Sequence, residues 1–281
     1  MKLITFDLGD NLPRPGLLES DRVYDLSSSG VRNVLDVIEG GLPALDVVAA
    51  VRDKGQPYAL ETVRLLAPIP RPPRVFGIGL NYEEHAAESK MKVQEVPTVF
   101  MKLSSVVGPG AEVILPKNAS QNDYEAELGV VIAKAGYRIS AEDWESYVFG
   151  YTIVNDVSAR DVQLATSQWT LGKSFPTFTP LGPAVVTKDE IPDPHALDIR
   201  LAIDGEVLQD SNTRHLIFRI PQLIEYISSI TPLEAGDIIS TGTPPGVGLG
   251  RTPQRWLRPE EEMVITIQGL GELRNRTRAE A

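Results

Sequence analysis

The chain has 281 residues, of which 42% are hydrophobic and 23% are charged, and these ordinary globular values exclude a mainly disordered protein. The formal net charge is −11, and no run of basic residues offers a surface to nucleic acid or to an anionic membrane. The absence of cysteine excludes disulfides, thiolate metal sites and cysteine nucleophiles. Because no stretch approaches the ~20 apolar residues of a membrane span, and no leader-peptide core is visible, we expect a cytoplasmic protein.

Residues 1–70 are predicted to form a small N-terminal α/β domain. After two strand patterns, apolar residues at helical spacing over 31–39 end at a pair of glycines, and a second helical segment follows over 44–54. The proline-rich segment 68–73 resists both helix and central strand, so we place a boundary there and a catalytic domain over 71–281. We assign no chemistry to the N-terminal domain.

A short helix after a buried strand carries the first candidate catalytic pair. The glycines of the strand over 74–80 indicate close approach of another backbone, and Asn81 and Glu84 form a capping-box pattern at the start of the helix. His85 and Glu88 share a helix face, and a carboxylate that orients an imidazole is typical of a general base that activates water. The alternative is a solvated helix face. Because so short a helix is marginal by itself, we hypothesise a lid that orders when ligand binds.

Short strands separated by turn residues dominate the rest of the chain. They are expected at residues 98–101, 112–115, 125–134, 148–154, 184–187, 199–203 and 264–267. One long helical pattern covers residues 216–230. These elements predict a mixed α/β, β-rich fold, sandwich or barrel-like, rather than a doubly wound sheet. Gly77 and Gly79 are accordingly a poor dinucleotide fingerprint, since no third glycine follows them.

Three carboxylates could form a metal site. Glu125 and Glu127 stand two residues apart in a predicted strand, so their side chains leave the same face. Asp156 follows a second strand-like run and could bring a third oxygen ligand to the same place. Oxygen ligands without cysteine favour Mg²⁺, Mn²⁺ or Ca²⁺ over zinc. The alternative is a polar strand face with scattered carboxylates.

Several basic side chains are candidates for substrate contacts. Lys173 lies among small and apolar residues and could hold a substrate oxygen or a developing negative charge. Arg160 is a weaker candidate, since it could instead form a structural pair with Asp161 or Glu125. Lys102 is also more easily explained as structural.

The glycine-rich segment 240–250 could bind a carboxylate through backbone N–H groups and the hydroxyls of Thr241 and Thr243. It is not a phosphate-binding P-loop, because no Gly-Lys-Ser/Thr follows. A plain loop is the alternative. His195 and His215 have no partner at a meaningful spacing, and we interpret them as surface or structural residues.

Taken in order, the motifs resemble the fumarylacetoacetate hydrolase family, in particular its acylpyruvate hydrolase and 2-hydroxyhepta-2,4-diene-1,7-dioate isomerase-like branch. The resemblance covers about residues 70–278 and rests on seven segments: 79–85 (GLNYEEH), 100–102 (FMK), 123–129 (DYEAELG), 155–163 (NDVSARDVQ), 172–175 (GKSF), 210–213 (DSNT) and 240–248 (STGTPPGVG). It implies a family-specific β-roll, usually a homodimer, with Mg²⁺ or Mn²⁺ held at Glu125, Glu127 and Asp156.

The resemblance also implies roles for other residues. His85 and Glu88 correspond to the water-activating pair on a lid, and Gln163, Lys173 and Thr241 to substrate contacts. Leu80 departs from the arginine of some acylpyruvate-cleaving relatives, which bears on the substrate.

We therefore expect a divalent-metal-dependent hydrolase that cleaves a C–C bond in an acylpyruvate-like or 2,4-diketo acid and releases pyruvate or a related 2-oxo acid. A bound cation would stabilise the leaving enolate, His85 would deprotonate the attacking water, and Lys173 would steady the developing charge. Decarboxylation of an oxaloacetate-like acid and isomerisation of a hydroxymuconate-type dioate are alternatives on the same site. A non-catalytic carboxylate binder is a third.

Overall fold

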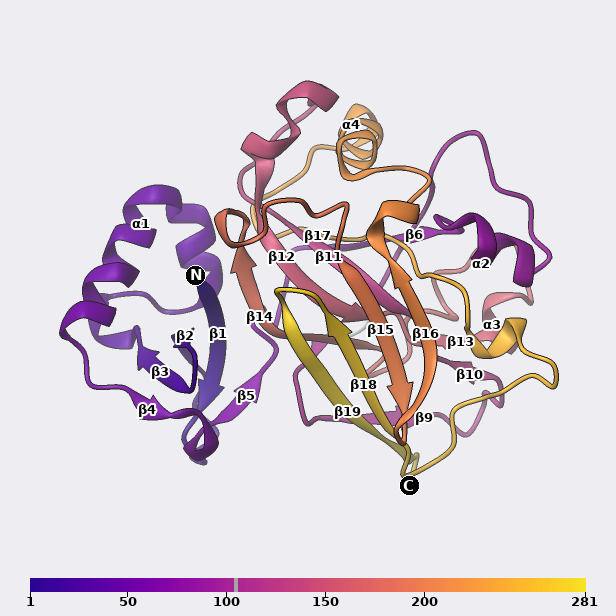
Figure 1. The fold of residues 1–281 in the computed structure, drawn as a ribbon, viewed down its shortest axis with the longest axis horizontal. Coiled ribbons are helices and arrows are strands. Elements are labelled where there is room, and N and C mark those ends of the chain that lie inside the picture. The colour runs from indigo at the N-terminus through magenta and orange to yellow at the C-terminus, as the bar shows by residue number, and fades with distance from the viewer. Residues whose placement is uncertain (104–105) are drawn as a thin grey trace.

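The computed structural model describes residues 1–103 and 106–281, and it confirms the mixed α/β, β-rich fold (Figure 1). One 12-stranded sheet contains β1 (Lys2–Asp7), β2 (Arg14–Glu19), β3 (Arg22–Asp25), β4 (Tyr58–Ala59), β5 (Arg64–Leu66), β6 (Val75–Gly79), β7 (Thr98–Met101), β8 (Val106–Val107), β11 (Ala126–Ile132), β12 (Val148–Asn155), β14 (Thr179–Thr187) and β17 (Ile238–Ser240). Its order is β4-β3-β2-β1-β14-β12-β11-β17-β6-β7, with β5 beside β1 and β8 beside β14.

A second sheet of five strands packs beside the first. Its order is β16 (Glu206–Asn212), β15 (Asp198–Ile203), β18 (Glu262–Ile267), β19 (Gly271–Ala279) and β9 (Glu112–Leu115). β10 (Asn122–Asp123) and β13 (Ser158–Ala159) form a separate short pair. The α-helices are α1 (Val34–Lys54), α2 (Glu83–Glu88), α3 (Arg160–Gln163) and α4 (Ile220–Ile230). The strands that were not predicted are β2, β4, β5, β8, β10, β13, β16, β17 and β19.

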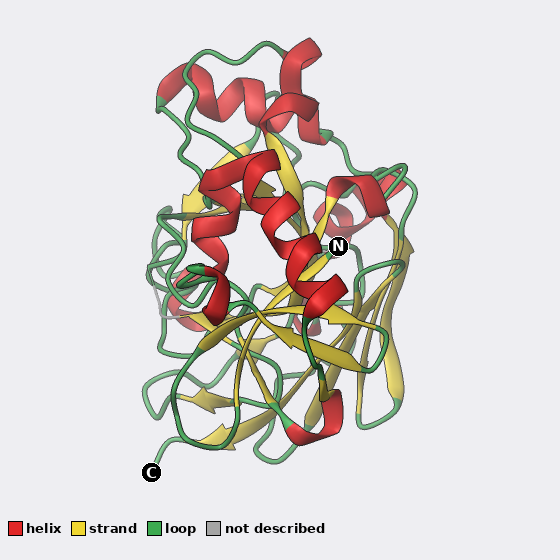
Figure 2. Cartoon of the chain, turned by 90° about the vertical axis from the view of Figure 1, so that its left-hand side faces the viewer, coloured by secondary structure: helices red, strands yellow, loops and turns green. Residues whose placement is uncertain are grey.

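Helix α1 replaces the two helices expected in the N-terminal region. Its N-terminus is capped by the side chain of Asn33, which accepts a hydrogen bond from the Asp36 amide at 2.9 Å. The helix is broken at Gly41, whose φ of 58° and ψ of −141° lie outside the helical region, so the predicted end at the glycine pair persists as a kink. Figure 2 shows the two parts of α1 facing the viewer.

The large sheet runs through both predicted domains. In Figure 1 the N-terminal lobe lies to one side of the molecule, and β1 joins it to the rest by pairing antiparallel with β14, where Lys2 lies opposite Val186. The division at residue 70 stays a prediction as a domain boundary.

Strand β11 lies deep in the large sheet, between β12 and β17, and all of its residues are buried. Its apolar side chains, such as Leu128 and Val130, are typical of a strand covered on both faces. Glu127 on the same strand is therefore unusual, because a buried carboxylate is costly unless charged or hydrogen-bonding partners surround it. Strand β11 therefore carries a buried carboxylate that hydrophobic packing alone does not explain.

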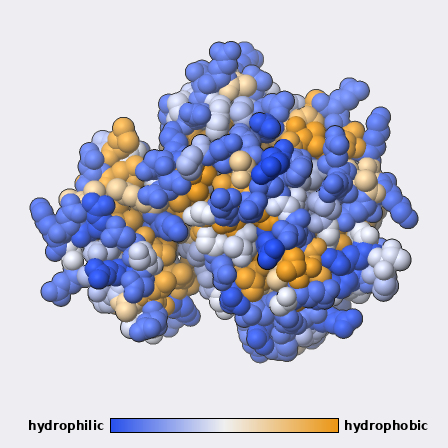
Figure 3. Space-filling model, viewed as in Figure 1, coloured by the Kyte–Doolittle hydropathy of each residue, from blue (hydrophilic) through white to orange (hydrophobic). Residues whose placement is uncertain are grey.

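The surface is mainly hydrophilic in the view of Figure 3, with smaller apolar areas between polar side chains. Within residues 1–103 and 106–281, no helix is long and apolar enough to cross a membrane.

Candidate metal centre and active site

The fold brings the three predicted metal ligands together. Antiparallel pairing of β11 with β12 places Ala126 opposite Asn155, so Glu125 and Asp156 meet where the two strands end, and the Asp156 amide donates to the Glu125 carbonyl at 2.9 Å. Glu127 lies two residues along β11, on the same face as Glu125. One carboxylate oxygen of each ligand lies within 4.8 Å of the others, and all three side chains are buried.

Each ligand carboxylate has its own hydrogen-bond partners. Glu127 Oε2 accepts from the hydroxyl of Ser240, the last residue of β17, at 2.6 Å and from the Gly242 amide just after that strand at 2.9 Å. Lys173 Nζ donates to Glu125 Oε2 at 2.5 Å and to an oxygen of Asp156 at 2.7 Å. These contacts fix the carboxylates in place.

Two further cations complete the surroundings of the triad. The ammonium group of Lys102 contacts the second oxygen of Asp156 and donates to the Lys173 carbonyl at 2.7 Å. Arg160 Nη2 lies 2.7 Å from Glu125 Oε1, while its Nε donates to Asp123 at 2.8 Å. Arg160 thus pairs with Glu125, one of the two partners that the sequence suggested, and Lys102 pairs with Asp156, a partner that was not predicted.

Negative charge exceeds positive charge in this cluster. Among the described residues, four buried carboxylates meet three buried basic side chains: Asp123, Glu125, Glu127 and Asp156 against Lys102, Arg160 and Lys173. Burial, with the nearby charges of Asp156 and Glu125, raises the pKa of Glu127 to about 8. An oxygen-only ligand set with one more carboxyl group than basic side chains fits a hard divalent cation such as Mg²⁺, Mn²⁺ or Ca²⁺, which would replace the proton of Glu127.

Opposite charges favour the ionised forms of Glu125 and Lys173. Burial opposes the charged form of Glu125, but Lys173 and Arg160 outweigh burial and hold the pKa of this carboxyl below its usual range. Burial likewise disfavours the Lys173 ammonium, yet Asp156 and Glu125 raise the pKa of Lys173 above its ordinary value. Lys173 therefore carries a positive charge in this site.

The predicted catalytic pair lies over the triad on α2. His85 Nδ1 and Glu88 Oε1 are 2.9 Å apart, and the second oxygen of Glu88 accepts from the Gly246 amide at 2.9 Å. With Nδ1 engaged, Nε2 of His85 is left for chemistry. The predicted cap at Asn81 is wrong: the N-cap is Tyr82 without a side-chain bond, because the buried Asn81 amide instead donates to the Phe218 and Thr241 carbonyls.

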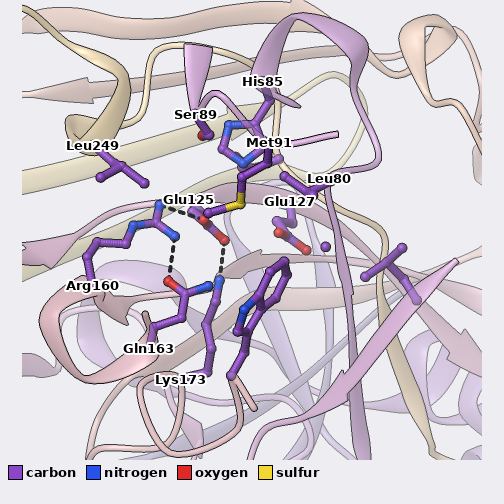
Figure 4. Close-up of a pocket in the computed structure, with 14 residues that line it drawn as sticks. Leu80, His85, Ser89, Met91, Glu125, Glu127, Arg160, Gln163, Lys173 and Leu249 are labelled. Carbon is purple, nitrogen blue, oxygen red and sulfur yellow. Dashed lines mark hydrogen bonds and ion pairs between the residues drawn. The ribbon is translucent and has the colours of Figure 1, made fainter. Parts of the chain in front are cut away.

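A small cavity of about 20 Å³ connects these groups (Figure 4). Its polar lining comprises His85, Ser89, Glu125, Glu127, Arg160, Gln163, Lys173 and Thr243, and its apolar lining comprises Ile78, Gly79, Leu80, Met91, Trp169 and Leu249. In Figure 4, His85 lies on the opposite side of Glu125 from Lys173 and Gln163. Apart from Leu80, whose departure from arginine was noted in the sequence, the apolar side chains were not predicted, since nothing in their local sequence distinguishes them from core residues.

The remaining candidates take different places. Gln163 lines the cavity, and its Oε1 accepts from Arg160 Nη1 at 2.9 Å. The Thr241 hydroxyl donates to the Leu128 carbonyl at 2.9 Å, whereas Thr243 lines the cavity. The substrate-contact roles of Gln163, Thr241 and Arg160 stay predictions.

The two other histidines lie apart from the cavity lining. His195 Nε2 accepts from the Ile220 amide at 3.2 Å, at the start of α4. His215 lines a different surface hollow beside Tyr82.

Comparisons with known proteins agree with this site. The chain is 43% identical to the mitochondrial oxaloacetate tautomerase of Rattus norvegicus, over 87% of this chain and 79% of the rat protein. The maleylpyruvate hydrolase of Sphingobium sp. SYK-6, solved with manganese(II) and pyruvate, superposes with a TM-score of 0.86 at 28% identity over the whole of both chains. The 5-carboxymethyl-2-hydroxymuconate delta-isomerase of Mycobacterium smegmatis superposes with a TM-score of 0.80 at 31% identity, also over both whole chains.

The sequence profile described as fumarylacetoacetate (FAA) hydrolase C-terminal matches residues 74–278, which is most of the chain and includes every residue of the acidic triad and of α2. The resemblance inferred from the ordered motifs is thereby confirmed. The protein belongs to the fumarylacetoacetate hydrolase family.

Proposed function

We propose that the protein is a divalent-cation-dependent tautomerase that interconverts the keto and enol forms of a short 2-oxo acid of the oxaloacetate type. The observation that carries this proposal is the convergence of three kinds of group on one small cavity: a hard-cation ligand set, the charged amine of Lys173, and the imidazole of His85. A cavity of about 20 Å³ holds about one water molecule, so even a short acid requires the lid to move. The rat relative carries oxaloacetate tautomerase in its name.

The residues divide the work of tautomerisation. A divalent cation at Glu125, Glu127 and Asp156 would supply Lewis-acid polarisation of the keto group. His85, held by Glu88 through Nδ1, removes a proton from C3 with Nε2, and the C3–H electron pair becomes the C2–C3 double bond. The keto oxygen takes a proton from Lys173, and exchange with water restores both side chains.

Hydrolysis of an acylpyruvate, which the sequence led us to expect, is the second candidate. It is favoured by the same His85–Glu88 pair, because an oriented imidazole also suits the deprotonation of water. The structurally similar maleylpyruvate hydrolase carries pyruvate and manganese. Oxaloacetate decarboxylation would use the same electrophilic centre. The choice of cation and the homodimer stay predictions.

The deciding experiment follows the fate of each substrate with Mg²⁺, with Mn²⁺ and with chelator. We expect the protein to speed decay of the enol absorbance of oxaloacetate beyond the rate with metal alone, and to speed deuterium entry at C3 in D₂O without faster pyruvate formation. Glu125→Gln should abolish this activity, whereas the exposed control Glu206→Gln should retain it. Cleavage of acylpyruvates that outpaces tautomerisation would assign hydrolysis instead.

A further inference from the structure

The two glycines of β6 make room for aromatic rings. Gly77 and Gly79 lie two apart and face the same side of the strand. A Cβ on Gly77 would lie 2.3 Å from the ring of Phe100, and a Cβ on Gly79 would lie 2.2 Å from Cζ3 of Trp169. The two rings meet edge to face, with centroids 5.9 Å apart. The two glycines were predicted to allow close approach of another backbone, and this prediction was wrong. The atoms that approach them are side-chain atoms of Phe100 on β7 and of Trp169 in the loop after α3.

The loop that carries Trp169 is held firmly. The Trp169 carbonyl accepts from the Lys173 amide at 3.3 Å, and the Ala159 amide donates to the Gly172 carbonyl at 2.8 Å. Gly172 also approaches Gln163 so closely that a Cβ there would lie 2.4 Å from the Gln163 nitrogen. These contacts anchor the backbone of the loop, and the half-buried indole of Trp169 packs against Gly79 and Phe100.

Trp169 and Leu80 line two cavities at once. One is the cavity of about 20 Å³ over the triad, and the other is an outer cavity of about 430 Å³. Leu80 has a φ of 55°, in the left-handed region that residues other than glycine rarely adopt, and its side chain is almost fully buried. Both side chains therefore lie between the two spaces.

The outer cavity offers no charge to a second carboxylate. Its other described lining residues are uncharged: Gln94, Thr98, Val99, Phe100, Ser167, Gln168 and Thr170. A substrate tail that reached this space would bury apolar atoms, and a carboxylate at the end of such a tail would meet hydroxyl and amide groups but no cation to form an ion pair.

We propose that Trp169 and Leu80 form a wall that sets the length of the substrate. The wall confines binding to short 2-oxo acids of about the size of pyruvate or oxaloacetate, and it separates them from an uncharged outer space in which a longer tail would otherwise lie. This inference rests on the proposed function, because the carboxylate and keto group must be anchored at the triad.

The test measures dissociation constants of the Mn²⁺-loaded protein by calorimetry for pyruvate and for 2-oxooctanoate. Wild type should bind pyruvate at least about tenfold more tightly. Trp169→Ala and Leu80→Ala should each move this ratio toward the longer acid by about tenfold or more, while pyruvate affinity changes less than about threefold. The ratio for Trp169→Phe should lie between those of wild type and Trp169→Ala. The ratio for Leu171→Ala, which changes an exposed leucine of the same loop, should equal that of wild type. The affinity for 2-oxooctanoate should rise more in Trp169→Ala than the affinity for the 2-oxo dicarboxylic acid of equal length, because the outer cavity has no charged lining residue for a second carboxylate.

Three results overturn the inference. The first is a wild type that binds 2-oxooctanoate as tightly as pyruvate. The second is an unchanged ratio in both Trp169→Ala and Leu80→Ala when circular dichroism shows each to be folded. In either case pyruvate still binds with Mn²⁺, so the proposed function stands. The third is a wild type that binds neither acid with Mn²⁺, which removes the proposed function together with the wall.

Discussion

Metal removal should make the stability of the protein fall as the pH rises, because of Glu127. Burial and the neighbouring Asp156 and Glu125 raise the pKa of this carboxyl from 4.5 to about 8, so the cation-free native protein binds more protons than the unfolded chain between these values. The stabilising contribution is complete below about pH 4.5 and is lost as the pH rises through 8. A bound divalent cation replaces the proton and removes this dependence.

The magnitude follows from linkage. One group changes the free energy of unfolding by at most about 1.4 kcal/mol per pH unit, so a rise from pH 5 to 8 costs the chelated protein on the order of 4 kcal/mol. For a chain of 281 residues this corresponds to about 7 °C in Tm. Glu125 does not contribute in this window, because Lys173 and Arg160 hold its pKa below the usual range.

The assay compares Tm in chelator and in saturating Mn²⁺ at pH 5, 6, 7 and 8. The gap between the two should widen with pH, and calorimetry in two buffers should show release of up to one proton per Mn²⁺ at pH 6.5. Burial lowers the pKa of His195, so this histidine makes the protein more stable as the pH rises. Its effect is the same with chelator and with Mn²⁺, and it therefore does not change the gap between the two Tm values. Glu127→Gln should give a chelated protein whose Tm lacks this slope. A constant gap, with no proton release, would refute the reasoning.

Three further changes test the site and its support. Lys102→Met should destabilise the protein by about 3–5 kcal/mol in chemical denaturation, because it leaves Asp156 with a buried charge lacking one partner; equal stability would contradict the ion-pair assignment. Glu88→Gln should lower kcat about 10- to 100-fold with little change in KM, since His85 loses its orienting carboxylate; a change confined to KM would indicate a binding role. Gly79→Ala should cost about 1–3 kcal/mol, as its Cβ overlaps an aromatic ring; an unchanged Tm would show that the ring moves freely.

The metal ligands could be predicted because they follow local rules. Alternation along a strand places Glu125 and Glu127 on one face, and Asp156 needs only the antiparallel pairing of the next strand. His85 and Glu88 were likewise visible from helical spacing. The kink at Gly41 was foreshadowed by the glycine pair, although the helix continues past it.

Other features depend on distant contacts that no local pattern encodes. The capping pattern at Asn81 failed because its amide binds carbonyls from remote loops, which stabilises the turn more than a cap on a six-residue helix. No local motif marks Trp169 as a residue of the site, because its contact with Gly79 depends on the fold. The reaction itself was not predictable from the motifs, since the same cation ligands, amine and imidazole serve tautomerisation, hydrolysis and decarboxylation.

Glu88 contacts two different parts of the chain. One of its oxygens lies against Nδ1 of His85 on the same helix, and the other accepts a hydrogen bond from the Gly246 amide of the glycine-rich segment. The helix cannot lift away from the glycine-rich segment without breaking the second bond, and the carboxylate that leaves the amide moves together with the helix that carries the histidine. If α2 moves to admit a substrate, His85 therefore leaves its position over the triad in the same movement. If the protein is the tautomerase proposed above, we expect an enol to form only after α2 has returned and placed the imidazole over the acidic cluster.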